Sequence, residues 1–158
     1  MMKFEIKRRF TGAVKFTTEI EAQKDAPASV KLRLAVLWAI ENKVDLSGSD
    51  LRGSNLSNCN LRGSNLSNCN LSGSDLRGSN LSRSDLRGSN LSGSDLRVLQ
   101  TDIWTVYVQK DTIRIGCQYH SISDWGQFTD GQIANMHGRA LIWWKIWKDI
   151  IFAIHATI

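Results

Sequence analysis

Residues 46–55 read Leu-Ser-Gly-Ser-Asp-Leu-Arg-Gly-Ser-Asn, and this five-residue pattern continues without a gap to Leu96. A leucine stands at every fifth position, so that residues 44–98 hold eleven units. A period of five fits neither the 3.6-residue period of a helix nor the two-residue period of a strand. Self-similarity at a fixed period instead predicts a repeat architecture.

The composition of one unit predicts how the repeats build a core. A single apolar residue per unit cannot form a core alone, but stacked coils can align the leucines in a column. The Ser or Cys two residues before each leucine is expected to share the interior, where only a small side chain fits. We therefore interpret two of the cysteines as packing residues. The predicted solenoid core is Leu46, Leu51, Leu56, Leu61, Leu66, Leu71, Leu76, Leu81, Leu86, Leu91, Leu96, Cys59 and Cys69.

The unit pattern resembles that of the pentapeptide-repeat family: a small residue, then Asp or Asn, then Leu, as in Ser49-Asp50-Leu51 and Cys59-Asn60-Leu61. The resemblance implies a mainly β fold, a right-handed quadrilateral β-helix in which four units make one square coil. Eleven units would then give about two and three-quarter coils. Bare coil ends are unpaired edges, so segments 1–43 and 99–158 are expected to cap the solenoid 44–98.

The N-terminal segment predicts a β-hairpin followed by a helix. Apolar residues alternate over 3–10 and again over 14–20, on either side of Gly12. Pro27 and Ser29 then indicate a helix start, and 30–42 carries an apolar side. This helix is expected to lie over the first coil.

The C-terminal segment predicts an α+β cap. Strands are expected over 103–109 and 112–119, and a last helix over 140–155. Between them, Ser121 or Ser123 could cap a short helix that holds Trp125 and Phe128, and Thr129 could cap another that runs through Met136. Together, the flanks resemble those of pentapeptide-repeat proteins from bacteriophages and prophages.

The last helix is unusually apolar and is a candidate homodimer interface. The residues expected to form that interface are Trp143, Trp144, Trp147, Ile150, Ile151 and Ile154. Two other interpretations stay open. The helix could be a core element that seals the second end of the solenoid, or it could lie on a membrane surface, where only two lysines would attract anionic lipid.

Positive charge is concentrated in the N-terminal segment. The chain carries a net charge of +5, and residues 1–43 hold nine Lys or Arg against five acidic residues. The run Lys7, Arg8 and Arg9 could contact nucleic-acid phosphates, or it could protect a hairpin edge by its charge. A weaker candidate for a partner surface is formed by the repeat arginines Arg52, Arg62, Arg77, Arg87 and Arg97.

The expected function is that of a non-enzymatic binding or assembly scaffold without a cofactor. Near-identical units offer no asymmetric constellation for catalysis. One alternative comes from the resemblance, because some pentapeptide-repeat proteins imitate duplex DNA and inhibit DNA gyrase. These repeats, however, are few and carry a formal charge of +1. A second alternative is an enzyme that uses Cys117 and His120, with Asp124 as orienter, although residues three apart on a strand point to opposite faces.

The cysteine content and hydropathy suggest a location. Three cysteines form an odd set without disulfide-scaffold spacing, which fits a reducing cytosol. The charged residues that follow Met1 and Met2 do not resemble a secretory leader. No uncharged apolar run reaches 18 residues, so we expect no membrane span and a cytoplasmic protein.

Overall fold

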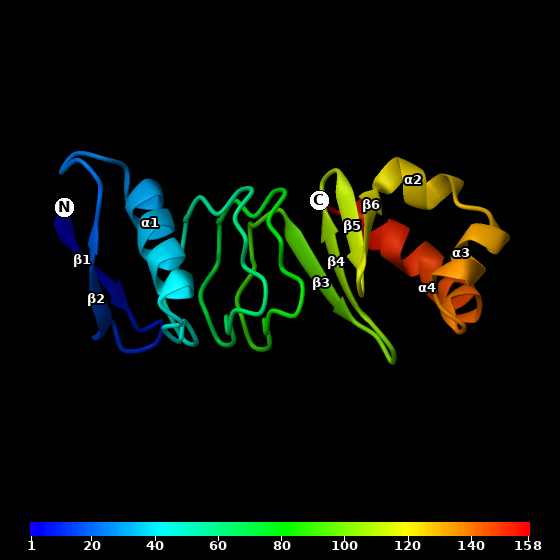
Figure 1. The fold of residues 1–158 in the computed structure, drawn as a ribbon, viewed down its shortest axis with the longest axis horizontal. Helices are drawn as coiled ribbons and strands as arrows, with labels where there is room; N and C mark the ends of the chain where they lie inside the picture. Colours follow the sequence, from blue (N-terminus) through cyan, green and yellow to red (C-terminus); the bar gives the residue numbers. More distant parts are fainter. The chain divides into compact units, whose positions relative to one another are not determined.

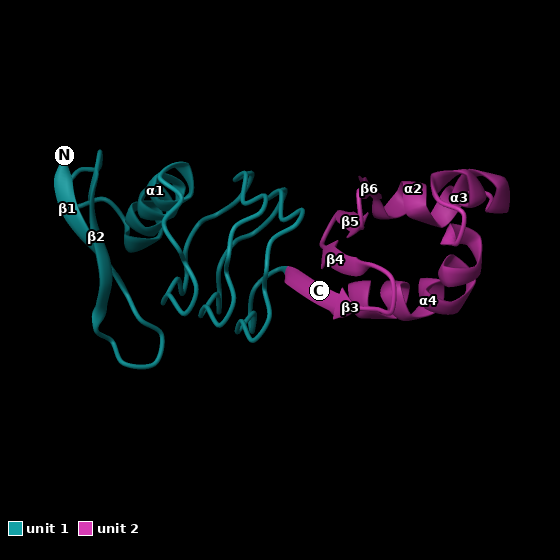
Figure 2. Cartoon of the chain, turned by 60° about the horizontal axis from the view of Figure 1, so that its bottom comes forward, with its two compact units in different colours: residues 1–95 teal, residues 96–158 magenta.

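The computed structural model describes residues 1–158, which form two compact units, 1–95 and 96–158 (Figure 2). The first unit contains a β-hairpin, a helix and most of the repeats. The second contains a four-stranded sheet and three helices (Figure 1). The boundary falls before Leu96, because the last repeat leucine begins a strand of the second unit. The prediction of separate segments 1–43, 44–98 and 99–158 stays a prediction.

The first unit begins with an antiparallel hairpin of β1 (Met2–Lys7) and β2 (Val14–Ile20). Its first strand ends earlier than the predicted residue 10, because the following residues pair with the repeats. Arg8 forms an antiparallel bridge with Ser49, and the amide of Arg9 donates to the carbonyl of Gly48 at 2.7 Å. The hairpin thus continues into the first coil.

Helix α1 (Ala28–Glu41) lies between the hairpin and the first coil (Figure 1). It buries Ala35, Val36 and Ala39. The guanidinium of Arg33 donates to the carbonyls of Asn55 and Ser57 at 3.2 and 2.7 Å. These bonds satisfy carbonyl groups at the edge of the coil that no further coil covers.

The repeats stack with a period of 20 residues, which is four units. Parallel bridges join Asp50 to Asn70, and the same spacing recurs up to the pair Asn70 and Asn90. The amide of Leu51 donates to the carbonyl of Asn70 at 2.8 Å, and the amide of Asn70 donates to the carbonyl of Ser49 at 2.9 Å. Units four apart therefore satisfy each other's backbone groups.

Each corner of the stack is a turn that the unit sequence explains. In every unit before the last, the Asp or Asn that precedes the leucine accepts a hydrogen bond from the amide two residues later, as Asn65 does from Ser67 at 3.1 Å. Such side chains favour turns for this reason. The fifth residue of the unit is left-handed, with φ near +65° at Gly73. Glycine adopts this conformation without steric cost, and Arg83 (φ 61°) adopts it without being Gly or Asn.

The leucine column is buried over most of its length. Nine of the eleven leucines and both small-position cysteines are less than a tenth exposed, whereas Leu86 and Leu91 are half-buried. These two belong to the last coil, over which no further repeat stacks. The extended residues of the repeats form isolated bridges, and the strands form only two small sheets. A mainly β chain is therefore not confirmed by the strand content.

The second unit is an antiparallel sheet in the order β3 (Leu96–Gln100), β4 (Thr105–Gln109), β5 (Thr112–Ile115) and β6 (Gln118–Ser121). The strand predicted over 112–119 is divided in two, because Gly116 adopts a left-handed turn with φ 57°. The helices α2 (Ile122–Gln127), α3 (Asp130–Met136) and α4 (Ala140–His155) follow close to their predicted positions. Ser121 and Thr129 form capping boxes at α2 and α3.

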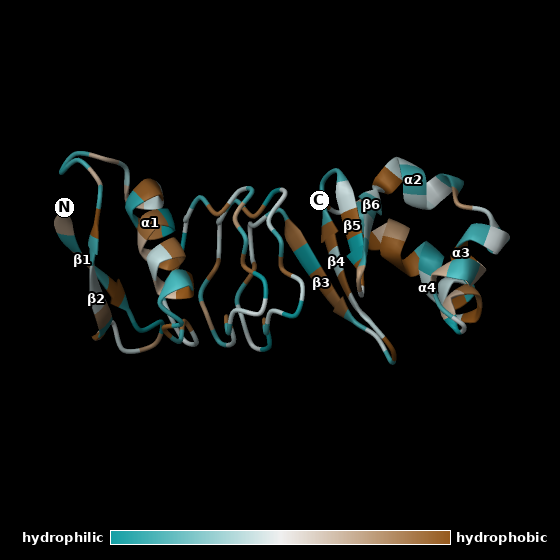
Figure 3. Cartoon of the chain, in the orientation of Figure 1, coloured by the Kyte–Doolittle hydropathy of each residue, from teal (hydrophilic) through white to brown (hydrophobic).

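Aromatic side chains dominate the core of the second unit. Trp125, Trp143 and Trp144 are buried against the valines and isoleucines of β4 and β5, together with Ile151. Figure 3 shows the largely hydrophobic colouring of α4. No helix of the chain has the length and apolarity that a membrane crossing requires.

Candidate functional site

Helix α4 presents a row of exposed isoleucines. The side chains of Ile142, Ile146 and Ile150 are 71%, 61% and 45% exposed. Their spacing of four residues places them in one stripe along the helix. We call these three residues the isoleucine stripe. Large apolar side chains gathered in this way mark a candidate contact surface.

The structure places most residues of the predicted dimer interface in the core of the second unit. Trp143, Trp144 and Ile151 are at most 4% exposed. Trp147 and Ile154 are half-buried and pack against the same core. Of the six predicted residues, only Ile150 is classed as exposed.

The predicted set combines buried and exposed residues because helical periodicity did not separate two apolar faces of α4. The indole groups of Trp143 and Trp144 fill the core, while the isoleucine stripe is left on the surface. The predicted interface did not include Ile142 and Ile146, although their spacing of four residues in the sequence already indicated an apolar stripe.

Charged residues flank the isoleucine stripe. The ammonium group of Lys145 forms an ion pair with Asp130 at 2.9 Å, and Asp149 is exposed one turn further along α4. The ammonium group of Lys148 lies 5.8 Å from the ring centroid of Trp144. The stripe therefore has both signs of charge at its edge.

The repeat arginines do not form one basic surface. Arg52, Arg77 and Arg87 each pair with the Asp two residues before them, at 2.6 to 2.8 Å. These partners neutralise each other locally, and hydrogen bonding from Arg87 lowers the pKa of Asp85 to about 2. Arg62 forms no ion pair, because the residue two positions before it is the neutral Asn60. Arg97 lies in β3 of the second unit.

The basic run of the hairpin is also divided by the structure. Lys7 and Arg8 are exposed. The guanidinium of Arg9 instead donates to the carbonyls of Gly88 at 2.9 Å and of Asn68 and Cys69 at 3.3 Å. Arg9 thus fastens the hairpin to the repeats, and the proposed contact of this run with nucleic acid stays a prediction.

The residues of the possible thiol enzyme are engaged separately. Nε2 of His120 lies 3.1 Å from the amide oxygen of Gln118, and its ring packs edge-on against Trp125. The carboxylate of Asp124 accepts from the hydroxyl and amide of Ser121, which lowers the pKa of Asp124. Cys117 is exposed in the turn before β6. The structure has no group of three or more His, Cys, Asp or Glu that could hold a metal ion.

The repeat cysteines are packing residues in the structure. Cys59 and Cys69 are buried, and burial raises the pKa of Cys69 to about 11. The thiol of Cys69 donates to the carbonyl of Leu46 at 3.0 Å. A thiol that stays protonated is a poor nucleophile.

Comparison with known proteins bears on the repeats alone. The family model described as pentapeptide repeats matches residues 42–78 and 64–97, with eight copies. No curated protein and no solved structure matches the chain. The match covers the residues that stack with the 20-residue period, and so residues 42–97 are a segment of pentapeptide repeats.

Proposed function

We propose that the chain is a non-enzymatic assembly scaffold that pairs with a second copy of itself through α4. The observation that carries the proposal is the isoleucine stripe, which stays exposed beside a helix face buried in the core. Exposed aliphatic side chains in a row favour association, because pairing removes their surface from water.

Charge at the edge of the stripe supports a second copy as the partner. Lys145 and Asp149 lie one turn apart on α4. In an antiparallel pair of α4 helices related by a two-fold axis, Lys145 of each copy can face Asp149 of the other. The ion pair of Lys145 with Asp130 is exposed on both sides, so exchanging it costs little.

The size of the stripe determines the strength expected of the dimer. From Ile142 to Ile150 the helix rises only about 12 Å. A stable interface buries roughly 800 Å² per partner, which is more than one such stripe provides. We therefore expect a dimer that dissociates on dilution.

In this proposal the repeats are a rigid spacer with the form of a right-handed quadrilateral β-helix. The backbone bonds between units four apart support four units per coil, and the handedness and square section are those implied by the family. The carbonyl contacts of Arg9 and Arg33 support a rigid connection between the hairpin, α1 and the coils.

The test is sedimentation over a range of protein concentrations. The native chain is compared with a variant carrying Ile142→Glu and Ile146→Glu, and with Phe10→Glu, which changes an exposed apolar residue of the first unit. We expect the native chain and the Phe10 variant to shift from monomer to dimer, and the double variant to stay a folded monomer. A native chain that is monomeric at every concentration, or a double variant that still pairs, contradicts the proposal.

A further inference from the structure

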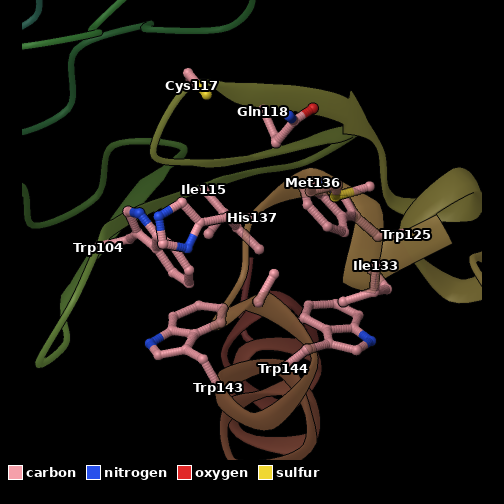
Figure 4. A pocket seen from close by; sticks show the side chains of 11 residues that line it. Trp104, Ile115, Cys117, Gln118, Trp125, Ile133, Met136, His137, Trp143 and Trp144 are labelled. Atoms are coloured by element: carbon pink, nitrogen blue, oxygen red, sulfur yellow. The ribbon is translucent and has the colours of Figure 1, made fainter. Parts of the chain in front are cut away.

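The second unit contains a small hollow whose wall is largely aromatic (Figure 4). Its volume is about 80 Å³. Four tryptophans and a histidine contribute to the wall: Trp104, Trp125, Trp143, Trp144 and His137. Figure 4 shows Trp104 and His137 on one side of the hollow and Trp125 on the other. Cys117 and Gln118 lie along a further side.

The aromatic rings of the wall are held at large angles to one another. The ring centroids of Trp104 and Trp143 are 5.0 Å apart and the rings are inclined by 79°. The rings of Trp104 and His137 are 5.3 Å apart and inclined by 86°. A group bound in the hollow would therefore be contacted by aromatic rings that lie in different planes.

The position of Trp104 depends on a glycine. A Cβ atom on Gly116 would lie only 2.9 Å from Cδ1 of Trp104. Gly116 also has a positive φ of 57°. This glycine therefore both turns the chain between β5 and β6 and lets the indole of Trp104 approach the backbone closely.

The chemistry of the wall excludes several classes of ligand. No Lys, Arg, Asp or Glu lines the hollow. The indole N–H groups of Trp125 and Trp143 are bound to the carbonyl of Ile113 at 2.9 Å and the hydroxyl of Thr101 at 3.0 Å. An anion would find no Lys or Arg here. A primary ammonium would bring three N–H donors to a wall whose polar side chains are only Cys117, Gln118 and His137, and Gln118 and His137 already have hydrogen-bond partners.

A methylated ammonium group suits this wall better than either an anion or a primary ammonium. Its charge is attracted by the electron-rich faces of aromatic rings, and its methyl groups present carbon to carbon. A quaternary nitrogen carries no N–H donor that would be left unpaired. The charge is also spread over the methyl surface, which lowers the cost of leaving water.

The size of the hollow points to the same kind of group. A cavity of roughly 150 Å³ holds a benzene molecule, and pockets for larger ligands measure about 300 to 1,000 Å³. The present hollow of about 80 Å³ suits a headgroup of a few heavy atoms, with the remainder of the molecule outside.

From the ring geometry, the wall chemistry and the volume, we propose that this hollow is a binding site for a trimethylammonium group. The site lies within the second unit, and it does not depend on the isoleucine stripe or on dimer formation. Trp104 and Trp143 would contact the group through their aromatic surfaces, and His137 would complete the same wall.

The test is a titration of the full chain with choline and with 3,3-dimethylbutanol, a neutral molecule of the same shape. The indole N–H signals of the six tryptophans are followed by nuclear magnetic resonance, and Trp38, which lies in the first unit, is the internal control. We expect the signals of Trp104 and Trp143 to move while that of Trp38 stays. Choline should bind roughly tenfold more tightly than the alcohol, as a desolvated cation–π contact predicts.

Two substitutions locate the bound group. Ala140→Leu places a larger side chain in the hollow, because Ala140 lines it. Trp104→Leu removes one aromatic wall, and Trp147→Leu is its matched control outside the hollow. The first two should abolish choline binding in a chain that still unfolds cooperatively, and the control should keep it. Should one of the first two fail to fold, the other decides.

The outcomes separate the proposal from its competitors. Equal binding of choline and the alcohol would make the hollow a general apolar cavity, and no binding of either would leave it unoccupied in solution; both results overturn the proposal. The same titration with N-acetyl-trimethyllysine amide distinguishes a methylated side chain from a small solute as the natural source. Tighter binding of either source supports the trimethylammonium site.

Discussion

The side-chain oxygen of Asn58 occupies the place that a Cβ atom on Gly78 would take. The two residues are 20 apart, and therefore lie at the same corner of consecutive coils, and both have a positive φ. Asn68 and Gly88 repeat this relationship at another corner. In its present rotamer, an asparagine in one coil thus leaves room only for a glycine in the next, although both residues occupy the same position of the five-residue unit.

Gly78→Ala is expected to destabilise the first unit more than Gly53→Ala. Both glycines have a positive φ, which costs an alanine about 1–2 kcal/mol. A Cβ at Gly53 would have free space, whereas at Gly78 it meets Asn58. Chemical denaturation measures the difference. Adding Asn58→Gly to Gly78→Ala should restore stability to the level of Gly53→Ala, and no restoration would show that the contact is unimportant.

Arg83→Gly is expected to stabilise the chain by roughly 1 kcal/mol, because Arg83 has the left-handed conformation of a turn glycine. The control is Arg83→Ala, which removes the same long side chain but keeps the backbone strain. A higher melting temperature for the glycine variant alone assigns the effect to the backbone. Equal gains for both variants would assign it to the side chain.

Leu66→Ala is expected to cost about 2–5 kcal/mol, as deletions of buried leucines do. Leu66 is fully buried in the column, whereas Leu91 in the last coil is half-buried. Leu91→Ala should therefore cost clearly less in the same denaturation experiment. Similar losses at the two sites would contradict a core that weakens towards its last coil.

Acid is expected to weaken the repeats through their aspartates. Hydrogen bonding from Arg87 lowers the pKa of Asp85 from 3.8 to about 2, so the folded state favours the ionised carboxylate. Its contribution is present above about pH 4 and is lost as the pH falls through about 2. Asp85→Asn, which keeps a side-chain acceptor at the turn, should flatten the decline of the melting temperature between these values. An unchanged decline would place the acid sensitivity elsewhere.

The sequence predicted those elements whose cause is local. The leucines revealed the column because one apolar residue per five can be buried only by stacking. Ser121 or Ser123, and then Thr129, indicated the starts of α2 and α3, and the caps in the structure are Ser121 and Thr129. In each case the decisive residues lie within a few positions of the feature they determine.

Features that depend on distant partners could not be predicted. The bonds of Arg9 to carbonyls some 60 and 80 residues away are invisible in a basic run. The two apolar faces of α4 differ only in that Trp143 meets the sheet and Ile142 does not. The hollow beside Trp104 needs residues from five segments of the second unit, so its wall became visible only in three dimensions.

The 20-residue period has a consequence for how the gene can change. Residues 51–60 and 61–70 are identical, so where their codons also match, the gene contains a direct repeat at which a polymerase can slip. One slip removes or adds ten residues, which is half of the structural period. Units within one coil of the change would then meet other neighbours, and the chain after the repeats would leave the stack half a turn from its present position. An added block would also place one asparagine over another at a corner where Asn58 now meets Gly78. Length variants that keep the fold should therefore differ by 20 residues, which is one whole coil, rather than by ten.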